Sequence, residues 1–449
     1  MAWPRTIIER TSQMVQSKKA WFAVAALAAA ATLTLAGCGG GSSDAGSSES
    51  AAPAGSYTSQ DCASDATSAT TLKVGTILPQ TGTLAFLGPP EIAGVGLAVS
   101  DIVDAGDSAC TFWTDSGDST DMAVSSASAD KLIDAKVSVA IGAASSSVSL
   151  NVVDKLAAAP IVQISPANTS AELSGKSPFY FRTAPPDTVQ GSALGQLIVG
   201  DGHQNVAFLV FNDAYGTGLR DVIQKTVEEA GGTVTYGGTG KGQEFPPGQT
   251  TFSSEVTAAI ASKPDAIVVI AFDETKAIVP ELVSQSWDMK STYYTDGNTS
   301  DYSKVFDKGT LEGAKGTIPG ANAADDFKKR LSDWHQSVEG SALSDYSYGA
   351  ESYDATILAA LAAKKGGATD PTTIQKNLAA VSGASGGTEC STYKECADLI
   401  AKGDSIQYKG VSGVGPFNAK NDPSSAFIGI YDFDADNKPV WKSAVEGKS

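Results

Sequence analysis

Short apolar runs that alternate with helix-like stretches are the feature that most constrains the fold of this chain. Residues 72–79 form the first run, and each later run is also followed by a stretch of helical character. Continuous β-branched runs separated by helices are typical of parallel sheets that helices cover on both faces. The sequence therefore predicts an α/β fold. The predicted strands are 72–79, 111–114, 137–141, 161–164, 206–211 and 266–271, with early helices at 91–103 and 121–135.

The length of the folded part indicates two domains. Roughly 390 residues follow the N-terminal region, which is more than one such core usually holds. Residues 184–187 (Ala-Pro-Pro-Asp) follow an extended segment and suit a stiff crossover between domains. Residues 316–320 resemble a return crossing, and 413–416 precede a final pair of strands at 427–433 and 438–441.

The N-terminus has the composition of an export signal. Four basic residues precede an uncharged apolar run at 20–34. A transmembrane helix needs about 20 apolar residues, so this run is too short to be one. Leu35-Ala36-Gly37-Cys38 resembles a bacterial lipobox, which implies cleavage before Cys38 and a lipid on its sulfur. The alternative is a plain secretory signal with a chance cysteine. Residues 39–56 suit a flexible tether, and no later segment is expected to span a bilayer.

Charge and cysteine content agree with an exported protein. Removing residues 1–37 leaves 28 basic and 49 acidic residues, a net charge of −21, which repels nucleic acid. Lipidation of Cys38 would leave four cysteines, and an even number in an exported chain favours disulfides. We expect Cys62–Cys110 and Cys390–Cys396. A zinc site is a poor alternative because the two histidines, His203 and His335, do not neighbour a cysteine.

Catalytic motifs are weak throughout the sequence. Residues 383–387 match G-x-S-x-G, but this motif works on a sharp turn between a strand and a helix, whereas a Gly/Ser-rich stretch surrounds it here. Residues 128–131 match S-x-x-K without its companion motifs, and 240–242 lack the hydroxyl residue of a phosphate loop. We therefore expect no enzymatic activity and no cofactor.

Five segments in fixed order resemble one known family. They include an opening strand with a Pro/Gly turn and a serine-rich loop after the third strand; the segments are 74–82, 141–147, 164–169, 180–183 and 212–216. Over about residues 72–441, the chain resembles the substrate-binding proteins of branched-chain amino acid ABC transporters. The resemblance implies the type I periplasmic-binding fold, with two Rossmann-like lobes, parallel sheets and three hinge crossovers. A ligand cleft would lie between the lobes.

The resemblance assigns one end of an amino acid to the first lobe. Ser146, Ala167 and Thr169 match the positions that hold the α-carboxylate in this family. These residues follow strands and stand where helices begin, and helix N-termini attract anions. The alternative role of Ser146 and Thr169 is to cap those helices, and the two roles are compatible.

The resemblance assigns the other end of the ligand to the second lobe. Asp296 falls where the family has an acidic acceptor for the ammonium group; the alternative is a solvated aspartate in a turn. Tyr215 would close over the ligand, and Phe272 matches an aromatic position of the pocket. Leu87 replaces a tyrosine common in valine and leucine binders, with Phe86 beside it, so the side-chain pocket should differ from theirs.

The resemblance also implies how the chain is divided. The divisions are a signal peptide (1–37), a tether and N-terminal segment (38–71), the first lobe (72–184 and 318–413) and the second lobe (185–317 and 414–449).

The predicted function is capture of a small ligand, in first place an amino acid, for the permease subunits of an ABC transporter. The protein would be a monomer, anchored by lipid on the extracytoplasmic side of the cell membrane. Alternatives are binding or sensing of an amide, urea or another small polar solute on the same fold, and a lipoprotein hydrolase.

Overall fold

The computed structural model describes Cys62 and residues 70–449. The predicted signal peptide, the lipidation site Cys38 and the tether lie outside the described residues.

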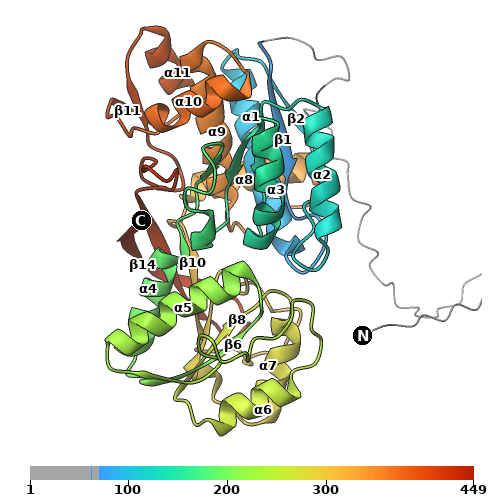
Figure 1. Cartoon of the computed structure of the whole chain (residues 1–449), viewed down its shortest axis with the longest axis vertical. Coiled ribbons are helices and arrows are strands. Elements are labelled where there is room, and N and C mark those ends of the chain that lie inside the picture. Colours follow the sequence, from blue (N-terminus) through green and yellow to red (C-terminus); the bar gives the residue numbers. More distant parts are fainter. Residues whose placement is uncertain (1–61, 63–69) are drawn as a thin grey trace, which may run out of the picture. The chain divides into compact units, whose positions relative to one another are not determined.

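A sheet of five parallel strands organises the first lobe, in the order β2-β1-β3-β4-β5. Figure 1 shows β1 and β2 of this sheet in the upper lobe, with α2 and α3 in front. Val139 and Ile141 of β3 pack with α1 and α9 on one face, while Ala140 packs with α2 and α3 on the other. Because both faces are covered, these strands have the continuous apolar runs seen in the sequence. The strands are β1 (Leu72–Ile77), β2 (Ala109–Phe112), β3 (Val139–Gly142), β4 (Val162–Ser165) and β5 (Tyr180–Arg182).

The helices of the first lobe come from two distant parts of the sequence. They are α1 (Gly88–Asp104), α2 (Met122–Asp134), α3 (Ser146–Ala158), α8 (Asp325–Glu339), α9 (Gly349–Gly366), α10 (Pro371–Val381) and α11 (Tyr393–Ala401), with short 3-10 turns η2 (Ala85–Leu87) and η3 (Ala171–Leu173). A small parallel sheet of β11 (Thr388–Cys390) and β12 (Ile406–Tyr408) lies beside them.

The second lobe has a sheet of seven strands in the order β14-β13-β10-β9-β8-β6-β7. Five strands are parallel; β13 extends the sheet antiparallel to β10, and β14 pairs antiparallel with β13 at the edge. The strands are β6 (Asn205–Val210), β7 (Thr233–Tyr236), β8 (Ala266–Ile270), β9 (Thr292–Tyr294), β10 (Lys315–Pro319), β13 (Ser425–Phe433) and β14 (Pro439–Lys448). The helices are α4 (Asp187–Gly200), α5 (Ala214–Glu229), α6 (Ser253–Ala261) and α7 (Thr275–Ser284), with the 3-10 turn η4 (Met289–Ser291).

The chain passes between the two lobes three times, at residues 183–186, 320–324 and 409–424. The third connection is tied to the first lobe by a fully buried ion pair, in which Arg182 Nε lies 2.6 Å from Asp422 Oδ1. Two lobes with largely parallel sheets and three crossovers confirm the predicted fold class.

Helix α1 is the apolar centre of the first lobe. Residues 85–104 are long and apolar enough to span a membrane, which the sequence analysis did not expect of any later segment, but 72% of that window is buried inside the fold. The helix packs against α8 and α9. Its composition is therefore that of a buried core helix.

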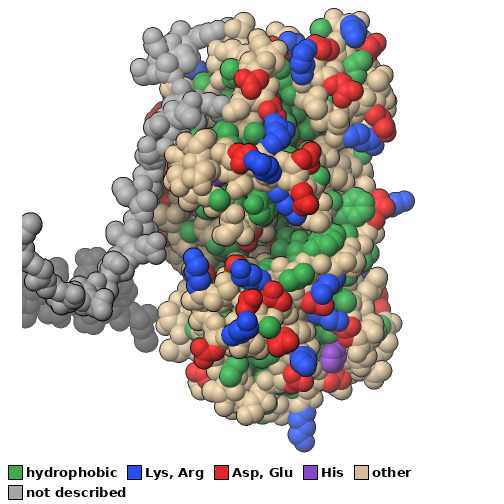
Figure 2. Space-filling view, turned by 180° about the vertical axis from the view of Figure 1, so that it is seen from behind, with side chains coloured by type: hydrophobic (Ala, Val, Ile, Leu, Met, Phe, Trp, Pro, Cys, Tyr) green, Lys and Arg blue, Asp and Glu red, His purple; other side chains and the backbone are tan. Residues whose placement is uncertain are grey.

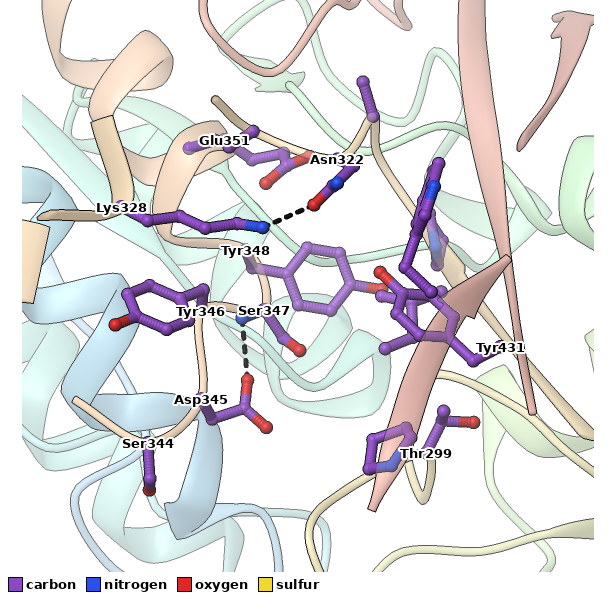
Figure 3. A pocket seen from close by; sticks show the side chains of 17 residues that line it. Thr299, Asn322, Lys328, Ser344, Asp345, Tyr346, Ser347, Tyr348, Glu351 and Tyr431 are labelled. Carbon is purple, nitrogen blue, oxygen red and sulfur yellow. Dashed lines mark hydrogen bonds between the residues drawn. The ribbon is translucent and has the colours of Figure 1, made fainter. Parts of the chain in front are cut away.

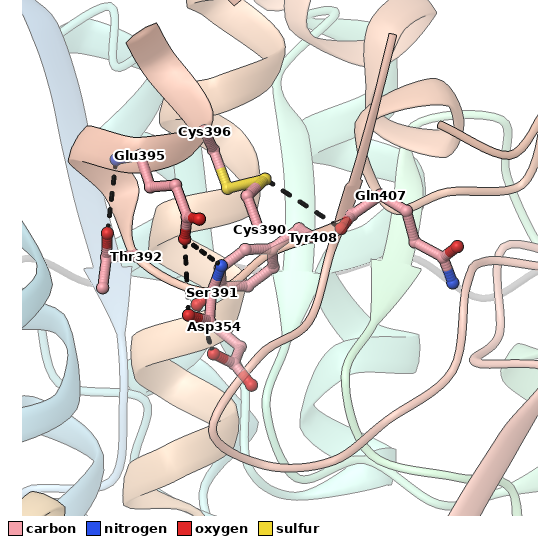
Figure 4. Close-up of a disulfide and its surroundings, with 8 residues drawn as sticks. All are labelled: Asp354, Cys390, Ser391, Thr392, Glu395, Cys396, Gln407 and Tyr408. Atoms are coloured by element: carbon pink, nitrogen blue, oxygen red, sulfur yellow. Dashed lines mark hydrogen bonds between the residues drawn. A yellow bond between two sulfur atoms is a disulfide. The ribbon is translucent and has the colours of Figure 1, made fainter. Parts of the chain in front are cut away.

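Two disulfides join the four cysteines that were expected to pair. Cys62 is bonded to Cys110 at β2, and Cys390 to Cys396 (Figure 4). The Cys390–Cys396 bond links β11 to α11 and lies near the carboxylate of Asp354, which accepts hydrogen bonds from Tyr408 and Ser412.

Acidic and basic side chains are interspersed over the face of the molecule in Figure 2, and hydrophobic side chains gather across its middle. This face therefore shows no basic patch suited to nucleic acid.

Gly96 should be required for the packing of α1. A Cβ at this position would overlap the ring of Trp334 on α8. We expect Gly96→Ala to lower the free energy of unfolding by about 1–3 kcal/mol, measured by urea titration. Gly200→Ala at the end of α4, where a Cβ meets no atom within 4 Å, is the matched control and should not destabilise. Equal effects of the two changes would contradict this role of Gly96.

Candidate functional site

A cavity at the carboxyl ends of the strands brings together residues from both lobes. It contains seven of the eight predicted ligand-binding residues. The exception is Phe86, which is partly buried against the hydrophobic cluster that contains Leu87 and Phe272. Ligands of open α/β sheets bind at this edge. The lining residues are Leu84, Leu87, Ala144, Ser145, Ser146, Ala167, Thr169, Tyr215, Phe272, Asp296, Gly297 and Tyr348.

Ser146 connects the two loops of the first lobe at the cavity. Its hydroxyl accepts hydrogen bonds from the amides of Thr169 (3.4 Å) and Ser170 (3.2 Å). The capping alternative is wrong for this residue, because Ser145 is the N-cap of α3 and accepts from the amide of Val148. Ser146 occupies the first helical position instead. The N-terminus of α3, with its partial positive charge, therefore opens on the cavity.

The hydroxyl of Thr169 is buried without a hydrogen-bond partner among the described residues. Its predicted capping alternative is also wrong, because Ser170 caps the following 3-10 turn. A buried hydroxyl without a partner costs free energy, so this atom is available to a ligand.

Asp296 is the acidic group of the second lobe at the cavity. It follows β9 and is 6% exposed, so it is not the solvated turn residue of the alternative interpretation. Its Oδ1 accepts from the Tyr215 hydroxyl (2.7 Å) and its Oδ2 from the Tyr348 hydroxyl (2.6 Å). Burial raises the pKa of Asp296, and these hydrogen bonds oppose the rise. In the part of the chain that the structure describes, no lysine, arginine or histidine pairs with it.

Tyr348 is a site residue that the sequence analysis missed. It precedes α9 of the first lobe with a left-handed backbone (φ 59°), so its hydroxyl reaches Asp296 across the cleft. Such a conformation is uncommon for a residue other than glycine. The local sequence, Tyr-Ser-Tyr-Gly at 346–349, contains no signal for this contact, since Asp296 is 52 residues away.

Asp187 is a second residue that the sequence analysis did not place in the site. It lies fully buried in the first turn of α4, and both carboxylate oxygens are without a hydrogen-bond partner in the described chain. Burial raises the pKa of Asp187 to about 8; the nearby Thr169 hydroxyl opposes this, and the charge of Asp296 adds to it. An acidic residue directly after two prolines at a crossover was the available signal.

Apolar and aromatic side chains form the rest of the wall. Tyr215 and Phe272 stack with their ring centres 5.8 Å apart, and Leu87 belongs to the same buried cluster. The cavity volume is about 10 Å³, which is room for one water molecule at most. A ligand of amino acid size therefore requires the lobes to separate or these side chains to move.

The residues of the weak catalytic motifs lie away from this cavity. Ser385 is exposed in the turn between α10 and β11, not between a strand and a helix, so the G-x-S-x-G match lacks its structural context. His335 contacts the carbonyl of Ser341 through Nδ1 (2.7 Å).

Two lobes that enclose polar groups at the ends of parallel strands define a bilobal binding protein. A family model described as periplasmic binding protein matches residues 71–394, more than half of the chain. The chain belongs to the periplasmic binding protein family.

Solved structures support the same fold. The leucine-binding protein LivK of Thermotoga maritima superposes with a TM-score of 0.68 at 18% identity, over 83% of this chain and 98% of that one. A second structure is the branched-chain amino acid transporter substrate-binding protein LivJ of Streptococcus pneumoniae in complex with isoleucine. It superposes with a TM-score of 0.67 at 22% identity, over 84% of this chain and 100% of that one. A third is a solute-binding protein of an ABC transporter from R. palustris in complex with 4-hydroxybenzoate. It superposes with a TM-score of 0.67 at 18% identity, over 84% of this chain and 97% of that one.

Sequence relatives match over shorter stretches. Human metabotropic glutamate receptor 8 is 32% identical over 139 residues, 30% of this chain. The leucine-, isoleucine-, valine-, threonine- and alanine-binding protein of Pseudomonas aeruginosa is 29% identical over 174 residues, 38% of this chain. The matches span 15% of the receptor's length and 46% of the binding protein's length.

The raised pKa of Asp187 should make stability depend on pH. Between the ordinary value of about 3.9 and the folded value of about 8, the folded chain keeps a proton that the unfolded chain releases. The free energy of unfolding from this group therefore falls as pH rises through that window. Asp187→Asn should lose less stability than the parent between about pH 5 and about pH 8 in urea titrations.

Asp404→Asn is the control, because Asp404 is exposed. It should show the pH dependence of the parent. If the free energy of unfolding of Asp187→Asn falls between about pH 5 and about pH 8 as much as that of the parent, the Asp187 carboxyl does not hold its proton in the folded chain.

Proposed function

We propose that this protein captures a small solute with an ammonium group, in first place an amino acid, outside the cytoplasm. It then delivers the solute to the permease of an ABC transporter. The observation that carries the proposal is the buried Asp296, which two tyrosine hydroxyls hold and no described cation neutralises. A buried carboxylate that has no positively charged partner favours binding of a cationic group.

The opposite wall of the cavity suits a carboxylate. The N-terminus of α3 and the partnerless Thr169 hydroxyl supply hydrogen-bond donors and a partial positive charge. An α-amino acid has two opposite charges, and removing both from water is costly unless each is paired. The two lobes supply one partner each, so such a ligand favours the closed form.

The relatives are consistent with this ligand class. The Pseudomonas relative is a leucine-, isoleucine-, valine-, threonine- and alanine-binding protein. Leu84, Leu87 and Phe272 give the pocket of this chain an apolar side, which suits a small apolar side chain. Asp187 lies behind Thr169, close enough to Asp296 for the two charges to interact.

A neutral solute such as an amide or urea is the second candidate. The raised pKa values of Asp187 and Asp296 favour it, because protonated carboxyls donate hydrogen bonds to uncharged ligands. A role in sensing would use the same cleft. We propose no catalytic role for the chain.

Asp296→Ala should weaken binding of the best amino acid from a thermal-shift screen by about 2–5 kcal/mol, because it leaves a buried ammonium unpaired. Thr169→Ala removes one charge-assisted hydrogen bond and should cost about 1.5–3 kcal/mol. Calorimetric titration measures both, with Asp404→Asn as a control that should bind like the parent. If folded Asp296→Ala binds as tightly as the parent, the ammonium assignment is wrong and a neutral ligand is favoured.

We also propose that a lipid on Cys38 holds the mature protein at the outer side of the cell membrane. Cys38→Ala should yield protein without bound lipid, which fractionation and mass spectrometry of the N-terminal peptide would show. A variant that is processed and membrane-bound like the parent would refute the anchor.

A further inference from the structure

A second, larger cavity lies beside the connection from β10 to α8. Its volume is about 280 Å³, against about 10 Å³ for the cleft cavity. Its walls come from the start of α9, from the connection at 321–323 and from the antiparallel strands β13 and β14 (Figure 3). Tyr348 lines both cavities.

Glu351 is a buried acid in the wall of this cavity. It lies in the first turn of α9 and is 3% exposed, and its own backbone N–H is the hydrogen-bond donor that opposes the rise in its pKa. Gly320 (φ 111°) leaves the space for it, because a Cβ there would overlap Glu351 Oε1. Burial raises the pKa of Glu351 to about 8, and the charge of Asp354 adds to the rise. No ion pair in the described chain neutralises this carboxyl.

Asp345 adds a second carboxylate to the cavity. One oxygen accepts from the amide of Ser347 at 2.7 Å, as Figure 3 shows. Lys328 is the basic residue of the lining, but its ammonium donates to Asn322 and forms no ion pair with Asp345 or Glu351. The lining therefore holds two carboxylates and one ammonium, and neither carboxylate forms a direct ion pair with Lys328.

Aromatic rings form the facing wall. Tyr431 and Trp441 are paired across β13 and β14, at an irregularity in the strand register, with ring centres 5.5 Å apart and planes at 83°. Burial raises the pKa of Tyr431, and the charges of Asp345 and Glu351 add to this, so its hydroxyl lies in the field of both acids. Aromatic faces and carboxylates are the groups that attract organic cations.

A bare metal ion fits this lining less well. Calcium takes six to eight oxygen ligands, and the described residues contain no group of three or more His, Cys, Asp or Glu that could hold a metal. The hydrocarbon surface of an organic cation, in contrast, buries against Tyr431 and Trp441.

We propose that this cavity is a second ligand site, which takes a small alkylammonium cation. Glu351 and Asp345 pair with its charge, and Tyr431 and Trp441 cover its alkyl groups. The site does not depend on which solute the cleft binds.

The probe is tetramethylammonium chloride, added to the purified full chain and followed by calorimetry and by tryptophan fluorescence. Tert-butanol, a neutral molecule of similar shape, is the matched control, with sodium chloride to equalise ionic strength. Saturable binding of tetramethylammonium and none of tert-butanol is expected. Failure of the cation to bind, or equal binding of both compounds, would overturn the proposal.

Variants test whether binding occurs in this cavity. Glu351→Gln should weaken tetramethylammonium binding about tenfold, and Trp441→Leu on the half-buried rim about fivefold. Trp441→Leu provides the test if Glu351→Gln fails to fold. Asp404→Asn and the cleft variant Thr169→Ala should bind the cation like the parent. If Thr169→Ala loses tetramethylammonium binding and Trp441→Leu retains it, the cation binds in the cleft and the second site is refuted.

Discussion

One buried carboxylate joins the two lobes across the cleft. Asp296 belongs to the second lobe, and it accepts hydrogen bonds from Tyr215 of the same lobe and from Tyr348 of the first lobe. Because the carboxylate is buried, these hydroxyls replace the water that it would lose on closure. Asp187 is buried nearby, and only the Thr169 hydroxyl opposes the rise in its pKa that burial causes, apart from the more distant charge of Arg182. The closed form without ligand therefore carries an unpaid electrostatic cost, which a cationic group in the cleft would remove.

Much of the architecture was predictable because it follows from local patterns. Buried parallel strands require long apolar runs, so β1, β3, β4, β6 and β8 were visible in the sequence. β7 was not predicted, since this strand is only partly buried and lacks a continuous apolar run. The core helix α1 met the composition of a membrane span, because complete burial in a protein and in a bilayer select the same residues.

The site was predictable only where family landmarks follow strands. Ser146, Ala167, Thr169, Tyr215, Phe272 and Asp296 all stand just after a strand, at the edge where the sheets present their ends. Tyr348 and Asp187 could not be found in this way. Tyr348 reaches the cleft through an unusual backbone conformation before α9, and Asp187 through the path of a crossover. The contact of Tyr348 depends on tertiary packing, which local sequence does not encode, whereas Asp187 had one local signal, its place directly after two prolines.

The Cys62–Cys110 disulfide has a mechanical consequence. Cys62 is bonded to β2, and its amide also donates to the carbonyl of Thr111 at 2.9 Å. Any tension on the chain before residue 62 therefore enters the first sheet directly at β2. The second lobe has no covalent link to that point except through the three crossovers. If the N-terminus is held, the first lobe is the stationary half of the molecule and the second lobe is the part that swings.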